Sequence, residues 1–140
     1  MKAPVYTTEI LRLAAALGEP RVIERTDGRA ELRSPACGST IATTVMLDDE
    51  FRVAAISQTV SACAFGQASA ALLERGARGR SAAEVRQALD ALGDWLGGRR
   101  EDVGAWPGLA ALAPARTKPG RHGAILLPFR ALLAAIEPPR

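Results

Sequence analysis

The chain has 140 residues, a length that suits one domain spanning residues 1–140 with one substantial hydrophobic core. Its 18 basic and 15 acidic residues give a net charge of +3, but the arginines are scattered and form no basic stripe with stacking aromatics, so we expect no nucleic-acid partner. The sequence has no apolar leader and no apolar run of membrane-spanning length, and two cysteines are too few for a disulfide framework. We therefore expect a cytoplasmic protein with free thiols and no membrane association.

The first half of the chain predicts one helix followed by three strands. Thr7 or Thr8 can cap the helix, and Gly18 ends it. Alternating apolar residues and β-branched side chains then predict strands over residues 30–34, 40–47 and 51–60. The polar turn at residues 48–50 joins the last two strands, so these should pair in an antiparallel manner.

The second half of the chain predicts helices. Small side chains after Cys63 are typical of a helix that packs closely on its neighbours. Ser81 and Glu84 form a capping box for the next helix, which Gly97 ends. A short helix over residues 107–112 should end at Pro114, and a last amphipathic helix should cover residues 124–136 with Pro128 in its first turn or at a kink. The predicted fold is α+β, a three-stranded, mostly antiparallel sheet with about five helices packed on one face.

The two cysteines should meet at one end of this fold. Cys37 lies in a turn before the hairpin, Cys63 begins the helix after it, and the hairpin returns the chain to the same end. His122, which precedes the last helix, is a candidate third ligand, because soft metals prefer thiolate and imidazole. Each residue also has an ordinary interpretation: the cysteines as small buried side chains, and the histidine as a surface or capping residue. We expect Cys63, at a helix N-terminus, to be the more nucleophilic thiol.

A catalytic Cys–His pair is a remote alternative. Cys63 would be the nucleophile and His122 its base. The sequence contains neither an oxyanion-hole motif nor a glycine-rich phosphate loop. We therefore expect no enzymatic activity.

The segments around the cysteines resemble a known family. Residues 35–39 read PACGS and residues 62–70 read ACAFGQASA, separated by the predicted hairpin. They are similar to the P-x-C-G-D and G-C-A-x-S-x-A-S motifs of iron–sulfur cluster assembly scaffolds of the IscU, SufU and NifU N-terminal type. The order of predicted elements extends this resemblance over nearly the whole chain. It implies that Cys37, Cys63 and His122 bind iron or a [2Fe–2S] cluster.

Three residues depart from the family pattern. Ser39 replaces the aspartate of the first motif, Ala62 replaces the glycine before the second cysteine, and Gly123 stands where the third cysteine of the family would be. The remaining ligand set is two thiolates and one imidazole, with Ser39 as a weak fourth position. Zn²⁺ tolerates such a set, whereas a [2Fe–2S] cluster normally takes four protein ligands and would be labile here.

The resemblance implies a scaffold or carrier that receives sulfur from a cysteine desulfurase and passes a cluster to recipient apoproteins. The departures keep a second hypothesis open, in which the chain is a degenerate relative that binds zinc or regulates a desulfurase without building clusters. Either protein would be a monomer or a weak homo-oligomer.

Overall fold

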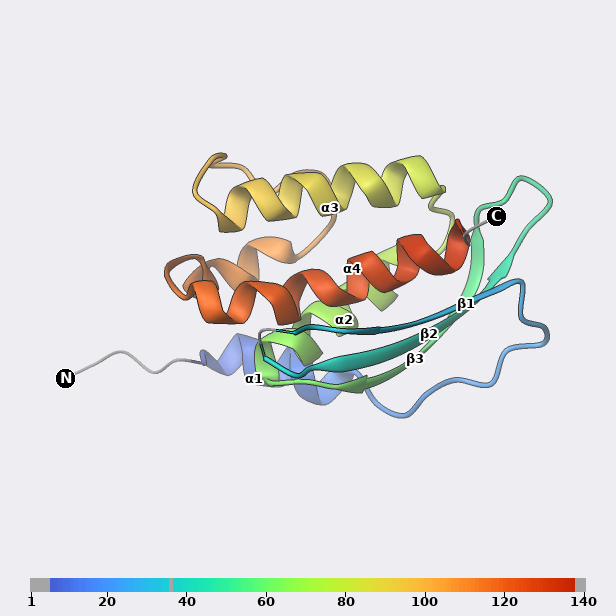
Figure 1. The fold of residues 1–140 in the computed structure, drawn as a ribbon, viewed down its shortest axis with the longest axis horizontal. Coiled ribbons are helices and arrows are strands. Elements are labelled where there is room, and N and C mark those ends of the chain that lie inside the picture. Colours follow the sequence, from blue (N-terminus) through green and yellow to red (C-terminus); the bar gives the residue numbers. More distant parts are fainter. Residues whose placement is uncertain (1–5, 36, 138–140) are drawn as a thin grey trace.

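The computed structural model describes residues 6–35 and 37–137, and it contains one three-stranded antiparallel sheet (Figure 1). The strands are β1 (Gly28–Arg33), β2 (Thr40–Leu47) and β3 (Val53–Ser61), in the order β1-β2-β3. On the central strand β2, alternate side chains are buried, so one face of the sheet carries the core. These buried side chains are Ile41, Thr43, Val45 and Leu47.

Helices cover that buried face in two layers. The α-helices are α1 (Thr8–Ala16), α2 (Ala64–Ala77), α3 (Ala82–Leu96) and α4 (His122–Ile136), and two 3₁₀ helices, η1 (Leu109–Thr117) and η2 (Pro119–Arg121), precede α4. Helices α2 and α4 pack against the sheet, α1 packs on α2, and α3 packs on α4 (Figure 1). The predicted α+β class and antiparallel sheet are confirmed.

Helix ends follow the predicted capping signals. The Thr7 side chain accepts a hydrogen bond from the Ile10 backbone N–H at 3.1 Å and so caps α1. The Ser81–Glu84 capping box is complete, and Gly97 ends α3. Within the described residues, no helix is both long and apolar enough to cross a membrane.

The prediction for Pro114 was wrong, and of the two places predicted for Pro128 the first turn is excluded. Pro114 does not end a helix but lies inside η1, where hydrogen bonds span three residues and a missing N–H removes only one of them. Helix α4 begins at His122, two residues earlier than expected, so Pro128 lies beyond its first turn. Pro128 is buried, and its missing N–H leaves the Ala124 carbonyl without its usual partner in the helix.

Candidate functional site

Three segments that are distant in sequence meet at one end of the sheet. Thr40, the first residue of β2, pairs with Ser61, the last residue of β3. The turn at residues 34–39 and the junction between β3 and α2 therefore leave the sheet at the same end (Figure 1). The start of α4 joins them, because Gly123 lies against the Ser34 side chain and Ala124 against Gly66.

The first turn of α2 packs unusually closely on the first turn of α4. A Cβ atom on Gly66 would lie 3.3 Å from both the Cβ and the carbonyl oxygen of Ala124, and only 2.7 Å from the Cβ of Ala62. One turn later, the buried Ser69 hydroxyl donates a hydrogen bond of 2.6 Å to the Ile125 carbonyl. The small side chains after Cys63 thus bring the second cysteine motif against the segment that carries His122.

Cys37 is exposed and lies beside two serines that are both at least 95% buried. The turn is held by backbone hydrogen bonds of 2.8 Å, from Ser34 N–H to the Ser39 carbonyl and from Gly38 N–H to the Ser34 carbonyl. The sulfur of Cys37 lies 3.1 Å from the Ser39 hydroxyl oxygen. Hydrogen bonds from the side chains of Ser34 and Ser39, and from the Ser39 backbone, lower the pKa of the Cys37 thiol, with a further contribution from the Arg121 charge. Ala36 of the first motif lies outside the described residues.

Cys63 is half-buried and occupies the N-cap of α2, one position before the first helical residue. Its carbonyl accepts the first hydrogen bond of the helix, 2.9 Å from Gln67 N. Both cysteines are free thiols. The sequence predicted Cys63 as the more nucleophilic thiol and contained no signal for Ser34, because only the folded turn places Ser34 beside Cys37.

His122 is the first residue of α4, and its ring is held by a backbone carbonyl. The Nε2 atom lies 2.8 Å from the Ala115 carbonyl oxygen, which can only accept, so Nε2 carries the proton. In neutral imidazole this leaves the lone pair on Nδ1 for a ligand. A histidine that binds a metal typically donates its other ring N–H in this way.

A side chain at position 123 would require Ser34 to shift. A Cβ atom on Gly123 would lie 2.6 Å from the Ser34 hydroxyl oxygen, closer than real Cβ atoms approach. The hydroxyl of Ser34 therefore occupies the space beside position 123, the position at which the sequence resemblance predicts a third cysteine.

In the described part of the chain, the acidic, cysteine and histidine side chains are not arranged to hold a metal ion. Among residues 6–35 and 37–137, no three His, Cys, Asp or Glu side chains are placed so that they could hold a metal ion. The set of Cys37, Cys63 and His122, with Ser39 as a weak fourth position, stays a prediction.

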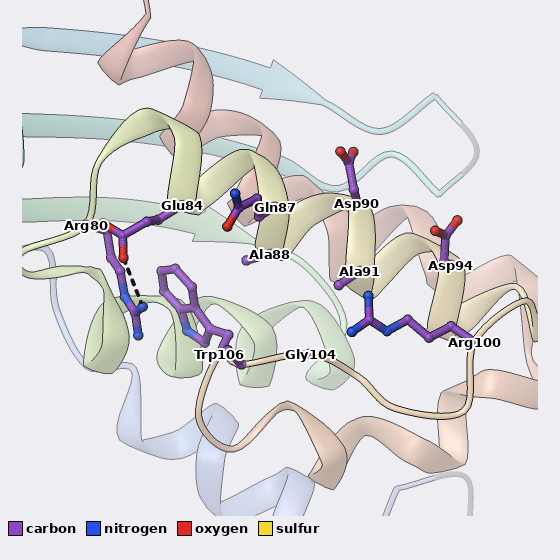
Figure 2. Close-up of a pocket in the computed structure, with 11 residues that line it drawn as sticks. Arg80, Glu84, Gln87, Ala88, Asp90, Ala91, Asp94, Arg100, Gly104 and Trp106 are labelled. Atoms are coloured by element: carbon purple, nitrogen blue, oxygen red, sulfur yellow. Dashed lines mark ion pairs between the residues drawn. The ribbon is translucent and has the colours of Figure 1, made fainter.

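A hollow of about 490 Å³ lies elsewhere, between α3 and the loop that follows it (Figure 2). Trp106 closes one side, with the Arg80 guanidinium 4.7 Å from its ring centre and the Glu84 carboxylate 3.6 Å from Arg80. The predicted ligands Cys37, Cys63 and His122 do not line it. The contacts among these residues join α3 to the loop and identify no ligand.

Comparison with known proteins gives the fold its context. Scans against protein-family models and against curated proteins found no match. Among solved structures, the N-terminal part of a nitrogen-fixing NifU-like protein from Brucella abortus is 29% identical, with a TM-score of 0.83 over 95% of this chain and 92% of that chain. A protein from Fervidobacterium islandicum AW-1, described as an iron–sulfur cluster assembly scaffold for the SUF system, is 19% identical, with a TM-score of 0.81 over 94% of this chain and 96% of that chain. The chain therefore has, over nearly its whole length, the fold of NifU-like N-terminal domains and SufU-type scaffold proteins, as its cysteine motifs predicted.

Proposed function

We propose that the chain is a non-enzymatic scaffold or carrier in iron–sulfur cluster assembly, with iron or a labile [2Fe–2S] cluster as its cargo. Cys37, Cys63 and His122 would bind the cargo. The observation that carries the proposal is the convergence of the first cysteine turn, the N-terminus of α2 and the start of α4 at one end of a NifU-like fold.

The donor set suits a cargo that must leave again. Two thiolates and one imidazole are ligands that iron accepts, and the lowered pKa of Cys37 favours its ligating thiolate form. A [2Fe–2S] cluster takes four ligands, so one would come from outside the chain. Exposure of Cys37 allows a partner to reach the site.

The partners follow from the same cargo. Sulfur would be supplied by a cysteine desulfurase, and the cluster would pass to recipient apoproteins. The SUF-system neighbour is described as a scaffold, which supports this role. Two free thiols fit a reducing compartment such as the cytoplasm.

Anaerobic reconstitution with iron and sulfide tests the proposal. We expect visible absorption and iron and sulfide contents that both fall to background in Cys37→Ala and in Cys63→Ala. Ser57→Ala, on the uncovered face of the sheet, is the control and should bind as the wild type does. Absence of visible absorption in the wild type would refute cluster binding.

A second candidate function rests on the filled corner at Gly123. Without a third thiolate, the chain would bind Zn²⁺ through Cys37, Cys63 and His122, with one open position, and would regulate a desulfurase rather than build clusters. Stoichiometric zinc binding without cluster formation would support this candidate. Zinc that still binds after Cys37→Ala combined with Cys63→Ala would contradict both functions.

A further inference from the structure

The hairpin between β2 and β3 carries an acidic and aromatic tip at the end of the molecule opposite the cysteines (Figure 1). Asp49, Glu50 and Phe51 are all exposed, and the Phe51 side chain is 73% exposed. The carboxylate of Asp48 accepts hydrogen bonds from the backbone N–H groups of Glu50 at 2.9 Å and Arg52 at 3.0 Å. These hydrogen bonds close the turn, which presents the three side chains to solvent.

Phe51 has a backbone conformation that its side chain disfavours. Its φ of 61° lies in the left-handed region, and it is the only non-glycine residue with a positive φ in the described part of the chain. A bulky side chain there costs free energy that glycine or asparagine would largely avoid. Because the ring is mostly exposed, packing within the chain does not offset this cost. Hairpin loops commonly place a residue in this region, but a phenylalanine there leaves a large apolar side chain in solvent that a partner surface would cover.

A hollow of about 550 Å³ lies beside this hairpin, between residues 21–24, the start of β3 and the C-terminal end of α2. Its lining is mixed, with charged side chains from residues 21–24 and α2 beside apolar ones, and Val22, at its mouth, is fully exposed. The apolar residues that line it are Val22, Ile23, Met46, Val53, Ala54, Ala55 and Ile56. Phe51 is not among the lining residues, so the hairpin tip does not fill the hollow of its own chain.

Three arginines surround the hollow and favour an acidic occupant. Arg75 and Arg78 are exposed and form no ion pair with any described residue. Two carboxylates also line the hollow: Glu74, which lies 4.0 Å from Arg21, and the exposed Glu24, so Arg75 and Arg78 supply its excess positive charge. Unpaired guanidinium groups beside the apolar side chains of the strands suit carboxylates that flank an aromatic ring.

The tip and the hollow are neighbours, because Met46 and Val53 flank the hairpin and also line the hollow. A two-fold interface needs this arrangement, with a feature and its complement on one surface. We propose that this end of the molecule is a symmetric dimer interface, in which the Asp49-Glu50-Phe51 tip of each copy enters the arginine-rimmed hollow of the other. Such a dimer leaves both cysteine ends free, and it does not depend on the proposed cargo.

Sedimentation velocity of the full chain over a wide concentration range tests the dimer. We expect reversible association from the 14.7 kDa monomer to twice that mass. Phe51→Gly keeps the backbone conformation and removes the ring, so it should raise the dissociation constant at least about tenfold. A monomer at every concentration would overturn the proposal, whatever other partner the hollow takes.

Charge exchange identifies the surface. Arg75→Glu with Arg78→Glu, and separately Asp49→Arg with Glu50→Arg, should each abolish the homodimer, because both of its contacts become repulsive. An equimolar mixture of the two variants should restore a dimer, because both contacts are then attractive. Asp90→Arg with Glu101→Arg changes exposed charges elsewhere and should leave the dimer intact. A dimer that survives both exchanges, or a mixture that stays monomeric, would overturn the proposed interface.

Discussion

The hydroxyl of Ser34 lies where a side chain at position 123 would begin, 2.6 Å from the Cβ that Gly123 lacks. Ser34 is 4% exposed, and its side chain is the largest cause of the lowered pKa of the Cys37 thiol. The buried Ser34 thus acts on the Cys37 thiol and also fills the space beside Gly123. The same serine therefore restricts the space for a side chain at position 123 and lowers the pKa of the Cys37 thiol.

Gly123→Ala should destabilise the protein by about 1–3 kcal/mol, because the new methyl group overpacks against Ser34. Alanine otherwise favours a helix over glycine, so the sign depends on this one contact. Ser34→Ala removes the clashing oxygen, since its Cβ would lie 3.8 Å from the new one. In urea unfolding, the double variant should therefore lose less stability than the two single changes predict together. Strict additivity would contradict the contact.

Loss of the serine hydroxyls should raise the pKa of Cys37. In a Cys63→Ala background, alkylation by iodoacetamide reports the thiolate of Cys37 alone. Hydrogen bonds from Ser34 and Ser39 favour that thiolate, so Ser34→Ala with Ser39→Ala should move the midpoint of the rate–pH curve upward and slow the reaction below it. Ser61→Ala, exposed at the end of β3, should leave the midpoint in place. An unchanged midpoint in all variants would rule out this role for the serines.

Glu74→Gln should stabilise the protein at neutral pH. Burial raises the pKa of Glu74 above its ordinary value of 4.5, so the ionised carboxylate is disfavoured in the folded chain. The contribution of the protonated carboxyl is complete below its pKa in the unfolded chain and is lost as the pH rises through its folded-state pKa. The gain from glutamine should therefore be present at neutral pH and vanish below pH 4.5. Glu24→Gln, exposed on the same hollow, is the matched control, and an equal gain from it would contradict burial as the cause.

His122→Ala should show how much His122 contributes to the free energy of unfolding and, separately, to zinc binding. The Ala115 carbonyl also accepts a hydrogen bond from Lys118 N at 2.9 Å, so removal of the imidazole leaves it partly satisfied. We expect a loss of about 0.5–1.5 kcal/mol in urea unfolding, together with clearly weaker zinc binding in calorimetry. The exposed Thr117→Ala should change neither. Unaltered zinc affinity in His122→Ala would remove the histidine from the ligand set.

Local patterns predicted most of the elements and the end of the sheet at which the cysteines lie. Alternation gave β2 its exact bounds at residues 40–47, and the capping signals at Thr7 and Ser81 gave the helix starts, because both depend on neighbours within a few residues. The proline signal failed at Pro114, and Pro128 lies beyond the first turn of α4. Both prolines lie inside helices that also pack against the core, and no local pattern reports that packing.

The sequence by itself determined the α+β class, the hairpin that brings Cys37 and Cys63 to one end, and the absence of a third cysteine, since residue type and local periodicity suffice for these. Only the tertiary structure decided that Ser34 fills the corner at Gly123, that Ala115 orients His122, and that the hairpin tip adjoins an arginine-rimmed hollow. Each of these contacts joins residues far apart in the chain, and their distances depend on how closely α2, α4 and the sheet pack together.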